Sequence, residues 1–121
     1  MGNFRALRAW QVARRLTDIS HEAIERLPTD ERFALAQQWR RATYSVALNL
    51  AEGAGRRTHR DFRRFVAAAR GSLDEIEAIL DIAEGFGYLR PEAIAELKQV
   101  RKQCAQLVTG LLHKLDGMVD K

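Results

Sequence analysis

Acidic and histidine side chains near the N-terminus come closest to a metal-ligand pattern. Asp18 and His21 have the three-residue spacing that di-iron four-helix bundles use, but such a site needs this pair on two helices and a carboxylate from each of two others. His59 and His113 have no acidic residue three positions before them, so the second half of the site is missing. We therefore interpret Asp18 and His21 as part of a polar helix face, and we predict no metal site and no cofactor.

Other chemical motifs are incomplete in the same way. Cys104 is the single cysteine, and no base lies near it in the sequence, so we expect a buried apolar side chain rather than a nucleophile. Residues 53–57, Gly-Ala-Gly-Arg-Arg, lack the third glycine of a dinucleotide-binding loop and the Lys-Ser/Thr of a P-loop. We interpret this segment as the end of a helix followed by a turn, and we expect that the protein is not an enzyme.

The strongest chemical signal is the basic segment, which we define as residues 56–70. It contains six arginines and one histidine, with Asp61 as its only acid. Positive charge at the start of a helix opposes the helix macrodipole, whereas guanidinium groups suit phosphates. The side chains predicted to contact nucleic-acid phosphates are Arg56, Arg57, Arg60, Arg63 and Arg64. The alternative is a solvated surface on which these charges pair with neighbouring acids.

A polar stripe precedes the basic segment. Five polar residues recur at intervals of three and four, which places them on one helix face: Gln38, Arg41, Ser45, Asn49 and Glu52. Ser72 and Glu75 lie close to a similar stripe. One interpretation is a solvated face. The other is a buried or subunit-facing network in which Arg41 pairs with Glu52 or Glu75, because an unpaired charge could not stay buried. That network, or subunit interface, would contain Arg41, Asn49, Glu52, Ser72 and Glu75.

Four helices are predicted to carry these groups, because apolar residues recur at three- and four-residue spacing and no stretch alternates as a strand does. The first covers about 4–27 and stops at Pro28. The second begins at Thr29, has Phe33 and Trp39 on its apolar side, and ends at a left-handed Gly53 or Gly55.

The remaining two helices have clearer boundary signals. Thr58 and Asp61 resemble a capping box at the start of the third helix, and Gly85 and Gly87 end that helix. Pro91 suits the first turn of the fourth. Helices of this length with short connections predict an all-α, up-down-up-down four-helix bundle.

Length, composition and net charge constrain the domain organisation and the class of protein. The chain of 121 residues, 46% of them hydrophobic, predicts one domain over residues 1–121. Its net charge of +4 is uneven: residues 1–70 hold 14 Arg and 7 acids (+7), and residues 71–121 hold 6 basic residues and 9 acids (−3). Neither a signal peptide nor a membrane-spanning run is visible in the sequence, so we expect a soluble, cytoplasmic protein with no membrane partner.

Several blocks together resemble one known family, the four-helix-bundle proteins associated with intervening sequences of bacterial 23S ribosomal RNA. The blocks include Leu-Arg-Ala-Trp at 7–10, Gln-Trp-Arg-Arg-Ala at 38–42, Ser-Val-Ala-Leu-Asn-Leu-Ala-Glu-Gly at 45–53, Ala-Arg-Gly-Ser at 69–72 with Glu75, and Gly-Tyr at 87–88. The resemblance covers roughly residues 7–112. Trp39 departs from it, because a smaller aliphatic residue is usual there.

This resemblance implies a homopentamer with no established enzymatic activity. The family is also similar in fold to the accessory variability determinant of diversity-generating retroelements, a basic pentamer that binds nucleic acid and a reverse transcriptase. We therefore expect a non-enzymatic homo-oligomer that binds RNA, or another nucleic acid such as DNA, through the turn between the second and third helices. The competing interpretation is a structural protein–protein adaptor that does not bind nucleic acid.

Overall fold

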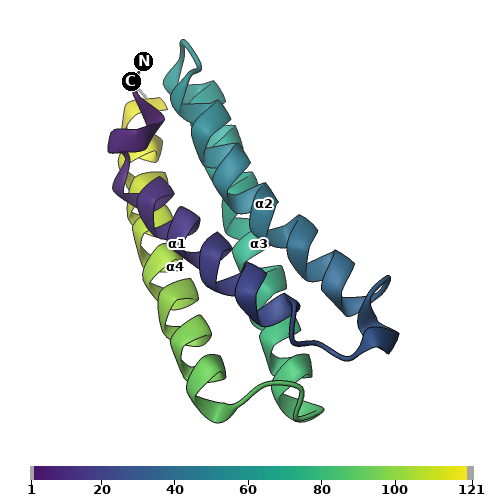
Figure 1. Ribbon diagram of the computed structural model, residues 1–121. Coiled ribbons are helices and arrows are strands. Elements are labelled where there is room, and N and C mark those ends of the chain that lie inside the picture. Colours follow the sequence, from purple (N-terminus) through teal and green to yellow (C-terminus); the bar gives the residue numbers. More distant parts are fainter. Residues whose placement is uncertain (1, 120–121) are drawn as a thin grey trace.

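The computed structural model describes residues 2–119 and contains four long α-helices (Figure 1). They are α1 (Arg8–Ile24), α2 (Leu35–Ala54), α3 (His59–Gly85) and α4 (Pro91–Val119), with two short 3-10 helices, η1 (Phe4–Ala6) and η2 (Thr29–Glu31). Each helix packs against the next, and α4 packs against α1, while the backbones of diagonally opposite helices in the described part of the chain lie further apart. The sequence-based prediction of an up-down-up-down four-helix bundle is confirmed.

The N-terminal helix begins later than predicted. Phe4 starts the short helix η1, and Leu7, with φ −75° and ψ 118°, is extended and separates η1 from α1. The Asn3 side chain accepts a hydrogen bond from the Arg5 N–H at 3.0 Å, which satisfies one of the free donors at this end. The break brings the Phe4 ring edge-on to Trp10, with 5.0 Å between ring centroids.

The predicted start of the second helix at Thr29 is wrong. Residues 29–31 form η2, and α2 begins only at Leu35, after an irregular residue at position 34. Glu31 explains this arrangement, because its carboxylate accepts hydrogen bonds from the Leu35 N–H at 3.3 Å and from the Tyr88 hydroxyl at 2.7 Å. As a result Phe33, which we placed on the apolar side of a helix, is 82% exposed.

The other helix boundaries follow the sequence closely. The Thr58 hydroxyl accepts the N–H of Asp61 at 3.1 Å and caps α3, and Pro91 is the first residue of α4, as predicted. Beyond the end of α3, Gly87 has φ +69°, a left-handed value that favours glycine. The expected left-handed glycine at the end of α2 is wrong, because Gly55 has φ −88° and continues the right-handed turn.

The apolar faces of the four helices meet in one core. Trp39, Leu16 and Leu50 are completely buried there, and Cys104 lies among them as predicted. Arg101 is the one charged side chain that is buried among the described residues, and it donates to the Glu77 carboxylate at 3.0 Å. None of the helices in the described part of the chain is both long and apolar enough to cross a membrane.

Candidate nucleic-acid interface

The turn between α2 and α3 lies at one end of the bundle, near the N-terminal segment (Figure 1). Gly53 makes the close approach of the two helices possible. A Cβ atom there would lie 2.8 Å from the Cβ of Phe65 and 3.0 Å from a ring carbon of Phe62. Because α2 and α3 are pressed together at this point, the first turns of α3 present the basic segment directly beside the end of α2.

Two arginines of the basic segment share one aromatic ring. The guanidinium carbons of Arg56 and Arg64 lie 4.6 Å and 4.9 Å from the centroid of Phe65. Arg56 also pairs with Glu52 at 2.8 Å, and Arg64 pairs loosely with Asp61 at 3.8 Å. These contacts hold both guanidinium groups at the surface, because cation–π attraction of this kind contributes about 0.5–1 kcal/mol at exposed sites.

The remaining three predicted arginines are placed differently. Arg57 and Arg60 are exposed, and neither forms an ion pair with any residue in 2–119. Arg63 instead reaches across to α4 and donates a hydrogen bond to Asp116. The five predicted arginines therefore divide into two without an acidic partner, two held over Phe65 and one tied to α4.

The polar stripe lies along the seam between α2 and α3. Gln38 donates to the Glu75 carboxylate at 2.7 Å, and the Ser72 hydroxyl donates to Ser45 at 2.8 Å. Asn49 donates to the Ser45 carbonyl at 2.8 Å. The stripe thus contains two hydrogen bonds that join α2 to α3 and one, from Asn49 to Ser45, that lies within α2.

Arg41 takes no part in that set. It is exposed and has no hydrogen bond or ion pair with the described side chains, because Glu52 pairs with Arg56 and Glu75 with Gln38. The suggestion that Arg41 is buried within the bundle and paired with one of these two carboxylates is wrong for the single chain. Asn49, Ser72 and the neighbouring Glu75 are the predicted network residues that the structure brings together.

The basic segment matches what phosphate binding requires. Guanidinium groups can donate two parallel hydrogen bonds to one phosphate, and they bind best where they are accessible and already oriented. Arg57 and Arg60 are accessible, and Arg56 and Arg64 are oriented by Phe65. A family model described as 23S rRNA-intervening sequence protein matches residues 5–110.

The chain belongs to this family.

The region that matches the 23S rRNA-intervening sequence protein family contains the whole basic segment and the polar stripe, and it ends before Asp116, the partner of Arg63. The family is named for an intervening sequence and not for a catalytic activity. No curated protein matches the chain.

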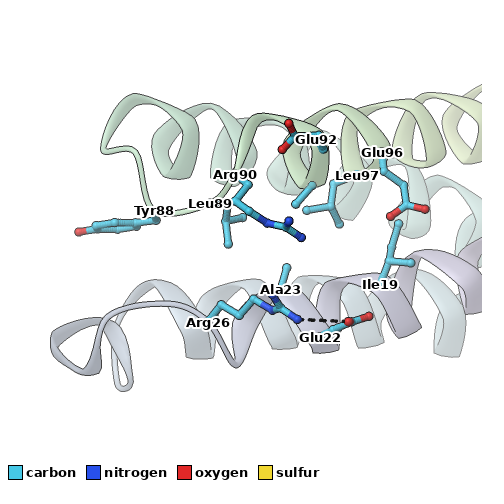
Figure 2. A pocket seen from close by; sticks show the side chains of 11 residues that line it. Ile19, Glu22, Ala23, Arg26, Tyr88, Leu89, Arg90, Glu92, Glu96 and Leu97 are labelled. Atoms are coloured by element: carbon cyan, nitrogen blue, oxygen red, sulfur yellow. Dashed lines mark hydrogen bonds and ion pairs between the residues drawn. The ribbon is translucent and has the colours of Figure 1, made fainter.

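A hollow at the opposite end of this family member differs in charge from the basic segment. It has a volume of about 330 Å³ and lies between α1 and the start of α4 (Figure 2). Arg26 and Arg90 line it together with three carboxylates, and Arg26 pairs with Glu22 at 3.5 Å. Charges of both signs therefore line this hollow, so it offers a polyanion no net attraction.

The structure also places Cys104 and the Asp18/His21 pair, for which the sequence predicts neither a nucleophile nor a metal site. Burial raises the pKa of the Cys104 thiol to about 12, so the sulfur stays protonated and a poor nucleophile near neutral pH. Asp18 and His21 are exposed on α1, where Asp18 pairs with Arg14 at 3.1 Å. Within residues 2–119, no three His, Cys, Asp or Glu side chains are grouped so as to hold a metal ion.

Two features of this 23S rRNA-intervening sequence protein were missed by reasoning from the sequence. The first is that the Phe65 ring supports Arg56 and Arg64. Its position next to Arg64 was a usable signal. The second is a groove lined by Phe4, Trp10 and other side chains, which depends on a packing of η1 that no local pattern indicates.

Proposed function

We propose that this protein is a cytoplasmic, non-enzymatic RNA-binding factor that contacts the RNA backbone through the basic segment. The observation that carries the proposal is that Arg57 and Arg60 are exposed at one end of the bundle without an acidic partner in residues 2–119. Arg56 and Arg64, which Phe65 orients beside them, bring two further guanidinium groups, paired at the surface with Glu52 and Asp61. Four guanidinium groups at one turn suit a few consecutive phosphates of RNA.

A titration in salt tests this proposal. Binding of a labelled RNA should weaken steeply with added salt, because each neutralised phosphate releases counterions, with a slope of roughly −0.7 for each phosphate of a single strand. The variant with Ala at the five predicted arginines should lose this binding. A matched control removes five exposed cations elsewhere, so that the net charge changes equally: Arg26, Arg32, Arg90, Lys102 and Lys114.

The outcome separates the two candidate functions. Retention of RNA by the five-alanine variant, or no retention by the wild type at low salt, would overturn the proposal and favour a protein–protein adaptor. An equal loss of RNA affinity in the five-alanine variant and in the control variant would mean that net charge alone attracts the RNA. That result would also contradict a specific role of the basic segment. The same titration with single-stranded DNA measures whether the 2′-hydroxyl contributes.

We propose further that the protein self-associates, as a homopentamer if it follows the proteins it resembles. Three large apolar side chains are exposed at the end of the bundle opposite the basic segment: Phe33 (82%), Phe86 (67%) and Ile82 (46%). The hydrogen bond between Tyr88 and Glu31 joins the two connections that carry Phe33 and Phe86, and Phe86 stacks on Tyr88 with 5.4 Å between ring centroids. Exposed apolar clusters of this kind are typical of protein interfaces.

Light scattering coupled to size exclusion tests self-association. The wild type should elute at a multiple of 13.8 kDa, and the double variant Phe33→Ser/Phe86→Ser should shift toward the mass of one chain. Tyr44 and Leu48 form a second exposed apolar surface, on α2, and substitutions there are compared in the same measurement of mass. A monomeric wild type would contradict the proposal. If several copies assemble, each repeats the basic segment, and the combined contacts raise the affinity for a long RNA.

A further inference from the structure

An open groove with a volume of about 570 Å³ lies between helices α1 and α2. This volume is within the range of sites that hold small organic molecules, roughly 300–1,000 Å³. The rings of Phe4, Trp10 and Tyr44 line the groove, and the small side chains of Ala47 and Ala51 leave space between them. The groove therefore combines aromatic walls with room for a flat molecule.

The exposure of these rings suits stacking. Tyr44 is 46% exposed, and Trp10 is only partly buried beside Phe4. Aromatic side chains that are open to solvent are the surfaces on which single-stranded nucleic acids stack their bases, because every base has a π face. If these rings were buried in the core, no ligand could reach them.

Polar groups occupy the other part of the groove. Arg14 and Asp18 line it as an ion pair at 3.1 Å, and His21 lies one turn further along α1. A ligand that fits here needs donors and acceptors at its edge, which a nucleobase has and a hydrocarbon lacks.

One end of the groove lies at the same end of the bundle as the basic segment (Figure 1). Ala51 lines it, and the next residue, Glu52, holds the Arg56 guanidinium at 2.8 Å. At the same end of the bundle the Arg5 guanidinium lies 4.6 Å from the centroid of the Phe4 ring. Positive charge thus borders the groove where a phosphate chain bound at Arg56 would pass.

We infer that the groove between α1 and α2 takes an unstacked nucleobase of a single-stranded RNA whose backbone lies on the basic segment. This inference rests on the proposed function and narrows the RNA to a single strand, since a base within a duplex is paired and stacked. Tyr44 and Trp10 stack on the base, and the polar groups of α1 contact its edge. A second copy of the chain, seated in the groove through apolar side chains, is the competing occupant.

Trp10 provides a reporter for this site. Trp39, the other tryptophan, is completely buried, so a ligand that quenches fluorescence by contact acts on Trp10. Three probes are titrated: single-stranded oligoadenylate, double-stranded RNA, and inorganic polyphosphate, which has the charge but no bases. Oligoadenylate should quench the emission, and the other two should bind without quenching. In the Trp10→Phe variant the quenching should disappear while oligoadenylate still binds.

The Tyr44→Ala variant measures the contribution of stacking. It should weaken oligoadenylate binding by roughly 5- to 150-fold and leave polyphosphate binding unchanged, since one stacked base contributes on the order of 1–3 kcal/mol. His113→Ala is the matched control, because it removes an exposed ring on α4, a helix that does not line the groove. That control should change the ratio of the two affinities by less than twofold.

Each remaining outcome decides the inference separately from the proposed function. If oligoadenylate binds through the arginines without quenching Trp10, or polyphosphate quenches equally, the groove is not a base site although the RNA-binding proposal stands. If the emission changes with protein concentration and not with RNA, a second copy occupies the groove. If oligoadenylate does not bind at all, the proposed function fails. The base site in the groove is then tested with adenosine at millimolar concentration. Quenching of Trp10 by adenosine supports the base site, and the absence of quenching overturns it.

Discussion

The guanidinium carbon of Arg56 lies 4.6 Å from the centroid of the Phe65 ring, so a residue at the end of α2 is held by one within the second turn of α3. Arg64 approaches the same ring to 4.9 Å. One aromatic side chain thus fixes two cations beside the α2–α3 turn. Ordering these long side chains in advance lowers the entropy that phosphate binding would otherwise cost.

Phe65→Leu tests the importance of this arrangement. Leucine retains apolar packing but offers no π face, so the RNA affinity should fall about two- to fivefold, in line with about 0.5–1 kcal/mol for cation–π attraction. The measurement is anisotropy of a labelled RNA, with urea unfolding to verify that the fold is intact. Arg56→Ala should then cost less affinity in the Phe65→Leu background than in the wild type. Additive losses would mean that Phe65 does not orient Arg56.

The arginines of the basic segment are expected to contribute unequally. Arg57→Ala and Arg60→Ala should each weaken RNA binding and reduce the salt slope by about 0.7, since each loses one phosphate contact to a single strand. Arg63→Ala should have a smaller effect on affinity, because Asp116 already neutralises that charge in the free protein. Binding of one RNA by the three variants across a salt series measures this. If the salt slope of the Arg63→Ala variant equals that of the other two variants, the expected unequal contribution of these arginines is contradicted.

The sequence predicted the fold well because the relevant signals are local. The apolar spacing, the Thr58 cap and Pro91 each act within a few residues, and the structure has the helices they indicate. The start of α2 could not be predicted in this way. It depends on the hydrogen bond from Tyr88 to Glu31, two residues 57 positions apart, which places Glu31 in a separate short helix.

The candidate site was predictable in composition but not in its pairing. The density of arginine between residues 56 and 64 is visible in the sequence, whereas the tie between Arg63 and Asp116 spans 53 positions. The polar stripe illustrates the same limit. Helical spacing correctly put its members on one face, but only the packing of α3 against α2 decides that Arg41 remains outside the hydrogen-bonded set.

Arg41 and Arg101 should therefore differ in their effect on stability. Arg41→Ala should change the free energy of unfolding by less than about 0.5 kcal/mol, as expected for an exposed side chain without a hydrogen bond or ion pair in residues 2–119. Arg101→Ala should cost about 1–3 kcal/mol, because Arg101 is 9% exposed, bonds to Glu77 and contributes its aliphatic stem to the core. Urea unfolding followed by circular dichroism compares the two. The reverse order would mean that Arg41 is covered, as it would be at a subunit contact.

The pKa of Cys104 leads to a prediction about its reactivity. Burial raises this pKa to about 12, so at pH 8 the native thiol is almost entirely protonated, and labelling by a disulfide reagent should be about a thousandfold slower than in urea. The unfolded thiol loses its proton near pH 8.5. The contribution of the protonated thiol to stability is therefore complete below about pH 8.5 and declines as the pH rises toward 12. Rapid labelling of the native protein at pH 8 would contradict the burial of Cys104.

Gly53 and Gly71 form a matched pair for testing the close approach of α2 and α3. Both lie inside helices, but a Cβ at Gly53 would come within 2.8 Å of the Cβ of Phe65, whereas a Cβ at Gly71 has no atom within 4 Å. Gly53→Ala should lower the free energy of unfolding by about 1–3 kcal/mol, because α2 and α3 must separate to admit the methyl group.

Gly71→Ala should have the opposite effect. An alanine inside an uncrowded helix turn stabilises by about 0.5–1 kcal/mol, since the unfolded chain loses conformational freedom and nothing in the folded chain is displaced. Urea unfolding of both variants measures the difference in sign. Because Phe65 also supports Arg56 and Arg64, Gly53→Ala should lower RNA affinity as well, and Gly71→Ala should leave it unchanged. A stabilising Gly53→Ala would show that the two helices can move apart without strain at this turn.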